Sequence, residues 1–237
     1  MAGRGMFRIG PLHHRPRLWL LVLVLIAAML GALWWKLAHW MPDRQEYPVQ
    51  GVWLDGNEGA IAFEDLPAAG SRFVYVTASR GAKGRNDTFG KAVAAARGAG
   101  LLVGAVHRYD PCRTADAQSA NFVTVVPREG DLLPPAVLLD GSGDNCTPRV
   151  RPAEVESELV TFLNQIESHA GQRAILAPTQ AFEAHYGFGA RAERQLWLAR
   201  DWLRPDYAGR PWELWTANAR ARIAPVDGAV AWVVARP

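Results

Sequence analysis

The sequence of 237 residues has few cysteines and no pattern typical of a metal site. It contains two cysteines, Cys112 and Cys146, without a CxxC pair, and six histidines without HxxxH spacing. Metal sites usually draw ligands from such short spacings, so we expect neither a metal ion nor another cofactor. A single cysteine pair in an exported domain typically forms one structural disulfide, and we expect Cys112 and Cys146 to be bonded.

A basic surface is also missing from most of the chain, although the pI is about 9.1. Residues 1–47 carry six basic and two acidic side chains, which leaves 20 basic and 21 acidic side chains in the remainder. Binding to nucleic acid depends on basic side chains facing the phosphates, so no nucleic-acid partner is expected. Apolar residues make up 49% and charged residues 21% of the chain, a composition typical of a folded protein.

One segment near the N-terminus lacks charge altogether. Residues 18–35, LWLLVLVLIAAMLGALWW, are long enough as a helix to cross a hydrocarbon core of roughly 30 Å. Four arginines precede this run and only Lys36 closely follows it, so the positive-inside rule keeps the N-terminus cytoplasmic. Bulky residues stand where a signal peptide has small ones, which favours an uncleaved anchor over a cleaved signal peptide.

These features divide the chain into four parts. The sequence predicts a basic cytoplasmic tail over 1–17, a transmembrane anchor over 18–35, a tether over 36–47 and a folded, exported domain over 48–237. The expected location is a bacterial inner membrane, with a single span and the domain in the periplasm.

The exported part alternates between short apolar runs and helical patterns. We expect strands over 51–54, 73–78, 101–109, 136–140, 174–177, 195–199, 213–216 and 229–234. Helices are expected from Asp87 to about Arg97, over 115–125 and from Pro152 to Gly171. Several strands are continuously apolar, as strands of a parallel sheet are. The pattern predicts an α/β fold, an eight-stranded irregular β/α barrel preceded by one transmembrane helix.

Eight stretches resemble, in the same order, glycoside hydrolase family 25, the muramidases that cut the glycan strand of peptidoglycan. They are Gly51–Leu66 (GVWLDGNEGAIAFEDL), Phe73–Gly81 (FVYVTASRG), Gly100–Tyr109 (GLLVGAVHRY), Gln118–Phe122 (QSANF), Leu133–Asp140 (LPPAVLLD), Leu196–Arg200 (LWLAR), Pro211–Thr216 (PWELWT) and Val226–Val230 (VDGAV). The resemblance implies that family's partly irregular β/α barrel.

The resemblance also implies carboxylates at the ends of the first, fourth and last strands, where the chain departs from the family. The corresponding positions hold Trp53, Leu138 and Ala231. On the fourth strand, Asp140 then takes the place of the family's catalytic Glu. In a register shifted by two residues, Asp140 takes the place of the family's Asp and Ser142 that of the Glu. Neither register preserves the acid pair that glycoside hydrolysis requires.

Polar positions around the implied site have changed as well. The residues that stand where the family has Lys, Glu, Tyr, Gln, Tyr and Asn are Thr77, Arg80, Ala177, Thr216, Ala217 and Val233. The strand hydrophobics and turn glycines persist, so the chain keeps a foldable scaffold. We therefore expect a pseudoenzyme that is associated with peptidoglycan and binds glycan or a cell-envelope protein.

Two alternatives stay open. One is a weakly active or altered N-acetylmuramidase with Asp140 as its acid, and the other is a structural interaction domain with a closed cleft. The candidate substrate-binding residues are His107 and Asp55 at strand ends and Trp215, whose indole is suited to stacking on a sugar. Trp53 is expected to fill space in the core.

Overall fold

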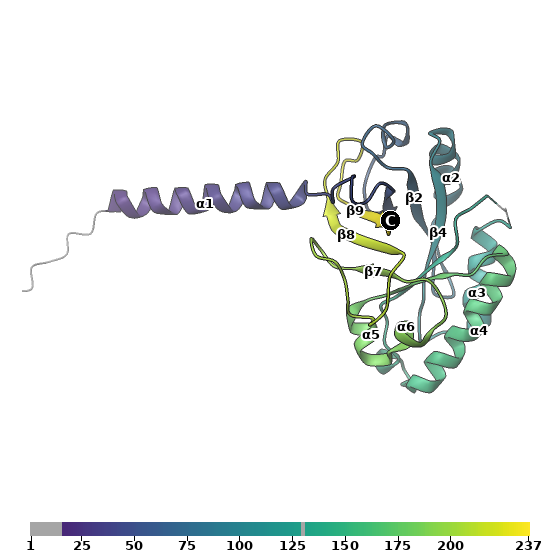
Figure 1. The fold of residues 1–237 in the computed structure, drawn as a ribbon. Coiled ribbons are helices and arrows are strands. Elements are labelled where there is room, and N and C mark those ends of the chain that lie inside the picture. Colours follow the sequence, from purple (N-terminus) through teal and green to yellow (C-terminus); the bar gives the residue numbers. More distant parts are fainter. Residues whose placement is uncertain (1–15, 129–130) are drawn as a thin grey trace, which may run out of the picture. The chain divides into compact units, whose positions relative to one another are not determined.

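The computed structural model describes residues 16–128 and 131–237 (Figure 1). The chain falls into two compact units, residues 1–37 and 38–237. The basic tail predicted over 1–17 lies outside the described residues, apart from its last two. The first unit contains helix α1, Pro16–Ala38, and its stretch Trp19–Ala38 has a mean hydropathy of 2.3. By length and composition this stretch is a candidate membrane span, as the apolar run predicted.

The second unit is built on one sheet, with strand order β6-β5-β4-β2-β1-β9-β8-β7. Strands β1, β2, β4, β5 and β6 are parallel, β7 is parallel to β8, and β9 is antiparallel to both of its neighbours. The nine strands are β1 Gln50–Leu54, β2 Phe73–Arg80, β3 Gly84–Arg85, β4 Leu102–Arg108, β5 Ala136–Leu139, β6 Ile175–Pro178, β7 Trp197–Ala199, β8 Leu214–Ala221 and β9 Val230–Ala235.

The sheet curls into a nearly closed barrel. A bridge between Leu176 of β6 and Leu196, just before β7, joins the two ends of the strand order. Eight strands form the wall, and the two-residue β3 pairs with the end of β2. The predicted eight-stranded irregular α/β barrel is therefore confirmed, and β3 is an addition that the sequence patterns did not indicate.

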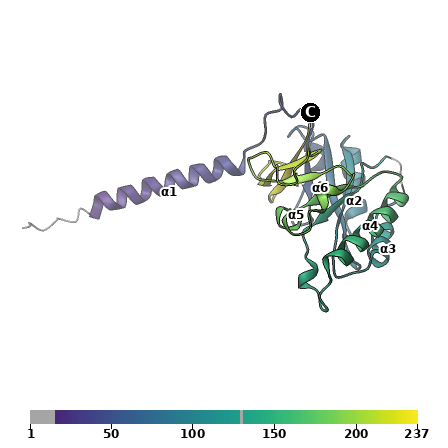
Figure 2. The same cartoon turned by 60° about the horizontal axis from the view of Figure 1, so that its bottom comes forward.

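Helices cover the outside of the early strands. α2 spans Phe89–Gly98, α3 spans Ala115–Val125 and α4 spans Pro152–Ala170, close to the predicted ranges. Thr88, rather than Asp87, is the residue that precedes α2. α3 and α4 lie side by side (Figure 1 and Figure 2). Two short helices that were not predicted, α5 Gln180–Tyr186 and α6 Phe188–Arg191, follow β6. No helix separates β7, β8 and β9, which makes the barrel irregular.

Alternation along the strands separates two apolar cores. The larger one lies between the barrel wall and the helices and includes Leu139, Leu159 and Phe162. The smaller one fills the barrel and contains Phe73, Tyr75, Val106, Ala136, Ile175, Trp197, Leu214 and Val233. Within a strand, the residues on either side of one that faces the barrel interior therefore face the helices.

Most of the predicted tether is packed on the barrel. The amide of Arg222 donates to the carbonyl oxygen of Ala38 (2.8 Å), and Asn218 Nδ2 donates to that of Trp40 (3.0 Å). Tyr47 is 3% exposed and contacts an aromatic cluster on β8. The compact second unit accordingly begins at Ala38.

Candidate active site at the barrel mouth

The barrel mouth is the end at which the parallel strands β1, β2, β4, β5 and β6 terminate, the place where β/α barrels carry their active sites. It contains a cavity of only about 40 Å³. The lining residues are Trp53, Val106, Leu138, Ala177, Pro178, Thr179, Trp197, Ala199 and Thr216. None of these nine described residues has a titratable side chain, so the cavity itself offers no acid or base.

Two indoles close this cavity. Trp53 on β1 and Trp197 on β7 meet edge to face, with 5.7 Å between ring centroids. Trp53 Nε1 donates to Thr77 Oγ1 (3.0 Å), and Trp197 Nε1 donates to Thr216 Oγ1 (2.8 Å). Ala231 of β9 is the cross-strand partner of Trp53. Each indole ring is packed against the other, and each indole N–H makes a hydrogen bond. We call this pair, Trp53 and Trp197, the plug of the barrel mouth.

Asp55 lies at the rim, just beyond β1. Its Oδ1 accepts from Thr77 Oγ1 (2.8 Å) and forms an ion pair with Arg80 Nη2 (2.9 Å). The Glu58 carboxylate accepts from the amides of Asp55 and Gly56 (2.5 and 2.8 Å), which fixes the turn after β1. Asp55 is thus held in a polar network at the rim, outside the apolar cavity.

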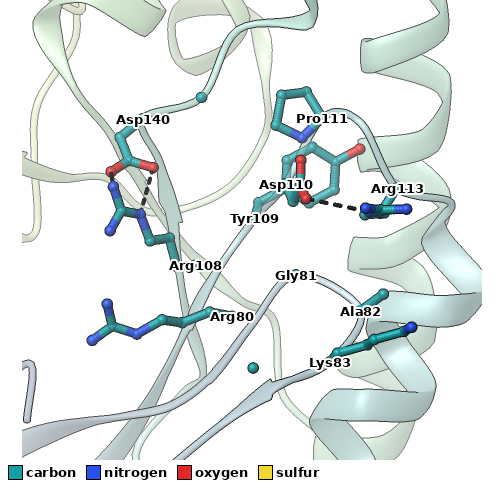
Figure 3. Close-up of a pocket in the computed structure, with 12 residues that line it drawn as sticks. Arg80, Gly81, Ala82, Lys83, Arg108, Tyr109, Asp110, Pro111, Arg113 and Asp140 are labelled. Atoms are coloured by element: carbon teal, nitrogen blue, oxygen red, sulfur yellow. Dashed lines mark hydrogen bonds and ion pairs between the residues drawn. The ribbon is translucent and has the colours of Figure 1, made fainter. Parts of the chain in front are cut away.

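Asp140 follows β5 and is held by an arginine from the neighbouring strand. Arg108 Nε donates to Asp140 Oδ1 (3.1 Å), and Arg108 Nη2 lies 2.6 Å from Oδ2 (Figure 3). Bidentate pairs of this kind fix both charge and geometry. Both carboxylate oxygens of Asp140 are therefore engaged by Arg108. Leu138 and Asp140 lie on the same face of the chain, but β5 ends at Leu139, so Leu138 lines the cavity and Asp140 lies one step farther out, at the groove.

A wider groove of about 500 Å³ adjoins the mouth (Figure 3). Its charged lining consists of four basic and two acidic side chains, Arg80, Lys83, Arg108, Arg113, Asp110 and Asp140. Arg113 Nε lies 3.7 Å from Asp110 Oδ2, a loose pair at the surface. The excess of positive charge in a concave surface attracts anions.

The disulfide supports one wall of this groove. Cys112, in the loop after β4, is bonded to Cys146, in the loop after β5, as predicted. The two loops touch where a Cβ added to Gly141 would come within 2.7 Å of Pro111 Cδ. Glycine is required there because the loops approach closely, and the bond keeps them together.

His107 lies in the larger core between the barrel wall and the helices, which we call the outer core, and away from the groove. It is fully buried, its Nδ1 is 2.8 Å from Ser79 Oγ, and its ring stacks at 4.7 Å on Phe162 of α4. Burial lowers the pKa of His107 to about 4, and a hydrogen bond with Gln118 opposes part of this shift. The expectation that His107 contacts substrate is corrected here, since its position on β4 faces the helices.

Trp215 is likewise a core residue. It is 3% exposed, its Nε1 donates to the carbonyl oxygen of Arg200 (2.9 Å), and its ring packs against Tyr47 and Trp40. It faces outward from β8, so it does not offer a stacking surface to a sugar. The expectation that Trp215 binds substrate is therefore corrected. As with His107, the alternation of side chains along the strand turns it away from the barrel interior.

Two residues at the mouth were missed by the sequence reasoning. Arg108 directly follows His107 and therefore faces the mouth, and Trp197 alternates with outward-facing neighbours on β7. Because side chains alternate along a strand, Arg108 lies on the same face as Val106, two residues before it, and this spacing could have predicted that Arg108 faces the mouth. Within residues 16–128 and 131–237, no three His, Cys, Asp or Glu side chains are grouped to hold a metal ion.

Comparisons with known proteins agree with this architecture. The chain is 26% identical over 162 residues to YegX of Escherichia coli O6:H1; the match covers 67% of this chain and only 57% of YegX. The family 25 glycosyl hydrolase from Bacillus anthracis matches with a TM-score of 0.74 and 22% identity, over 84% of this chain and 93% of that one. The bacterial lysozyme from Streptomyces coelicolor matches with a TM-score of 0.69 and 19% identity, over 80% and 92% of the two chains.

The sequence also matches a family model. The model for glycosyl hydrolases family 25 matches residues 54–221, which include every strand of the barrel wall except β9 and most of β1. The matched range contains the cationic groove and the lining of the mouth cavity apart from Trp53. The chain therefore belongs to glycosyl hydrolases family 25.

Proposed function

We propose that this protein is a membrane-anchored pseudoenzyme of family 25, which binds the glycan of peptidoglycan without cleaving it. The observation that carries the proposal is the mouth of the barrel, where Trp53 and Leu138 occupy positions that the family resemblance assigns to carboxylates. Glycoside hydrolysis requires one group to protonate the leaving oxygen and a second to stabilise or attack the sugar. The mouth cavity contains neither.

The rim carboxylates do not replace the missing pair. Asp55 is bound to Arg80, and Asp140 is bound through both oxygens to Arg108. A general acid must be within hydrogen-bond reach of the leaving oxygen, whereas the oxygens of these two carboxylates are occupied by arginine side chains. The geometry supports recognition better than hydrolysis.

The groove supplies a surface for that recognition. Peptidoglycan carries carboxylates along its peptide stems, and Lys83 and Arg113 bring positive charge to the lining of the groove (Figure 3). An acidic polymer is therefore a better match for this surface than a neutral glycan. In this proposal the glycan strand crosses the closed mouth while the stems contact the groove.

The location follows from the anchor and the disulfide. The span in α1 and the preceding arginines support a bacterial inner-membrane protein with its N-terminus in the cytoplasm. The Cys112–Cys146 bond supports an oxidising compartment such as the periplasm for the domain.

The test uses the full chain in detergent micelles with purified sacculi. We expect co-sedimentation with the sacculi and no release of soluble muropeptides. Charge reversal at Lys83→Glu with Arg113→Glu is expected to weaken binding at least tenfold. Arg173→Glu is the matched control, because this exposed arginine precedes β6 and lies at the opposite end of the barrel.

The possible results separate the alternatives. Muropeptide release that is abolished by Asp140→Asn would refute the pseudoenzyme and establish the second candidate, a weak muramidase with Asp140 as its acid. Absence of both binding and release from a folded protein would refute glycan recognition and leave a structural interaction domain.

A further inference from the structure

The loop that follows β7 exposes two large apolar side chains next to each other. Trp202 is 43% exposed and Leu203 is 58% exposed. Outside α1, residues 16–128 and 131–237 contain no other consecutive pair of exposed large apolar side chains. Single exposed apolar residues are ordinary on a protein surface, so it is the adjacent pair that requires an explanation.

Trp202 also has a backbone conformation that bulky residues avoid. Its φ is +62°, and no other non-glycine residue in the described part of the chain has a positive φ. Such conformations persist where the surroundings hold them, and they cluster at functional surfaces. The amide of Trp202 donates to the carbonyl oxygen of Ala217 (2.8 Å), and the amide of Ala219 donates to Asp201 Oδ1 (2.6 Å). These bonds tie the loop to β8 and fix the place where the indole is displayed.

The point at which the chain leaves α1 is bound just beyond the end of β8. Arg222 binds Ala38 through its amide, and Asn218 binds Trp40 through its side chain. From the residue that binds Trp202 to Arg222, the strand covers at most about 17 Å. Because this length of chain is short, the exposed pair is within reach of the surface of a membrane that α1 spans.

Exposed arginines accompany the apolar pair. Arg200 pairs with Asp206 (3.1 Å), and Arg204 pairs with Glu46 and lies over the ring of Tyr47 (5.6 Å to the centroid). Tryptophan prefers the boundary between headgroups and acyl chains, and long arginine stems cover apolar surface beside it, while the two ion pairs keep the rim of the loop polar. The chemistry of the loop matches the headgroup layer of a phospholipid bilayer.

We propose that Trp202 and Leu203 insert into the headgroup layer of the bilayer that α1 spans, so that the barrel lies against the membrane instead of extending from it on a free tether. The inference rests on the anchor in the proposed function. It goes beyond that function because it assigns the domain a second, direct membrane contact. The packing of residues 38–47 on the barrel leaves little free chain to carry the domain away.

The test uses the full chain in vesicles of phosphatidylethanolamine and phosphatidylglycerol. A cysteine introduced as Leu203→Cys is labelled with an environment-sensitive fluorophore without reductant, and quenching by lipids with a nitroxide near the headgroup is measured. Val160→Cys is the matched control, since Val160 is an apolar residue on α4 that is 38% exposed. We expect at least twofold stronger quenching at position 203 than at position 160.

Each contrary result has its own meaning. Equal quenching at positions 203 and 160 would overturn the membrane contact. A shielded label at position 203 without lipid quenching would also overturn it, and would show that a protein, such as a second copy of this chain, covers the loop. Leu25→Cys reports on the anchor through nitroxides deep in the bilayer. Quenching at 25 without quenching at 203 refutes only the loop contact, whereas no quenching at 25 refutes the anchor itself.

A second variant tests the contribution of Trp202 with a substitution that should not disturb the fold. Trp202→Gly removes the indole at a position whose positive φ glycine adopts readily, so the fold should be kept. In the Leu203→Cys background this change is expected to reduce lipid quenching at position 203 by at least half. Unchanged quenching would remove Trp202 from the proposed contact.

Discussion

The indole of Trp53 meets that of Trp197 edge to face at the mouth of the barrel, at an interplanar angle of 71°. The two residues come from β1 and β7, 144 positions apart in the chain. Trp197 also lies 5.0 Å from the ring of Tyr75, so aromatic packing continues from the mouth into the barrel interior. The mouth of the barrel is therefore filled by side chains from distant parts of the sequence.

Removing the plug should weaken the fold without creating activity. Trp53→Ala is expected to lower the free energy of unfolding by about 3 kcal/mol, because it leaves a cavity and removes the hydrogen bond to Thr77. Urea unfolding measures the loss, and Trp53→Phe is the control that keeps most of the volume. Muropeptide release should stay absent in both variants. Release by the Trp53→Ala protein would show that the plug, and not the missing acids, blocks hydrolysis.

Asp140→Asn separates binding from catalysis. The change removes a negative charge from the groove and leaves Arg108 without its carboxylate partner. We expect sacculus binding to become a few times tighter, and the free energy of unfolding to change by less than about 1 kcal/mol, because the pair is partly exposed. Co-sedimentation and urea unfolding test the two parts. Weaker binding would show that Asp140 itself contacts the ligand.

His107 makes stability depend on pH. Its pKa in the folded protein is about 4, below the ordinary value of 6.5. Between these values the unfolded chain binds a proton that the folded chain does not, so the free energy of unfolding decreases as the pH falls. The contribution of this residue between pH 7 and pH 5 is about 2 kcal/mol. His107→Gln should show a correspondingly shallower decline in urea unfolding at the two pH values. An equal decline would assign the pH dependence to other groups.

The disulfide should stabilise both the fold and the groove. Cys112 and Cys146 are 34 positions apart, and closing a loop of this length stabilises a protein by about 3 to 4 kcal/mol. The double variant Cys112→Ser with Cys146→Ser should lose that much in urea unfolding and bind sacculi less tightly, because the loops after β4 and β5 separate. Reductant should weaken the unsubstituted protein and leave the double variant unchanged. A double variant as stable as the parent protein would contradict this role.

Local patterns predicted most of the elements. Short runs rich in apolar residues, several of them continuous, predicted all eight wall strands, and apolar residues at helical spacing predicted α4 from Val155 to Ile166. Shorter elements were missed. α5 has seven residues and α6 four, too few for a period to stand out, although Thr179 caps α5 by accepting from the amide of Phe182. β3 is a strand only because it pairs with β2.

It was harder to predict whether an individual strand residue points into the barrel or toward the helices. His107 and Trp215 were assigned to the cleft by residue type, yet the alternation of their strands turns both toward the outer core. A period of two indicates which residues share a face. It does not say which face is the inside of the barrel, because that depends on how distant strands close the sheet.

Residue type alone excludes a proton donor at Trp53, Leu138 and Ala231, the positions to which the resemblance to family 25 assigns acids. The sequence also determined the apolar run that forms α1 and the single cysteine pair. Only the tertiary structure decided that Arg80 and Arg108 hold the remaining rim carboxylates, and that residues 38–47 lie on the barrel. Those contacts join elements far apart in the chain, and they exist only once the strand register and the closure of the barrel have brought the elements together.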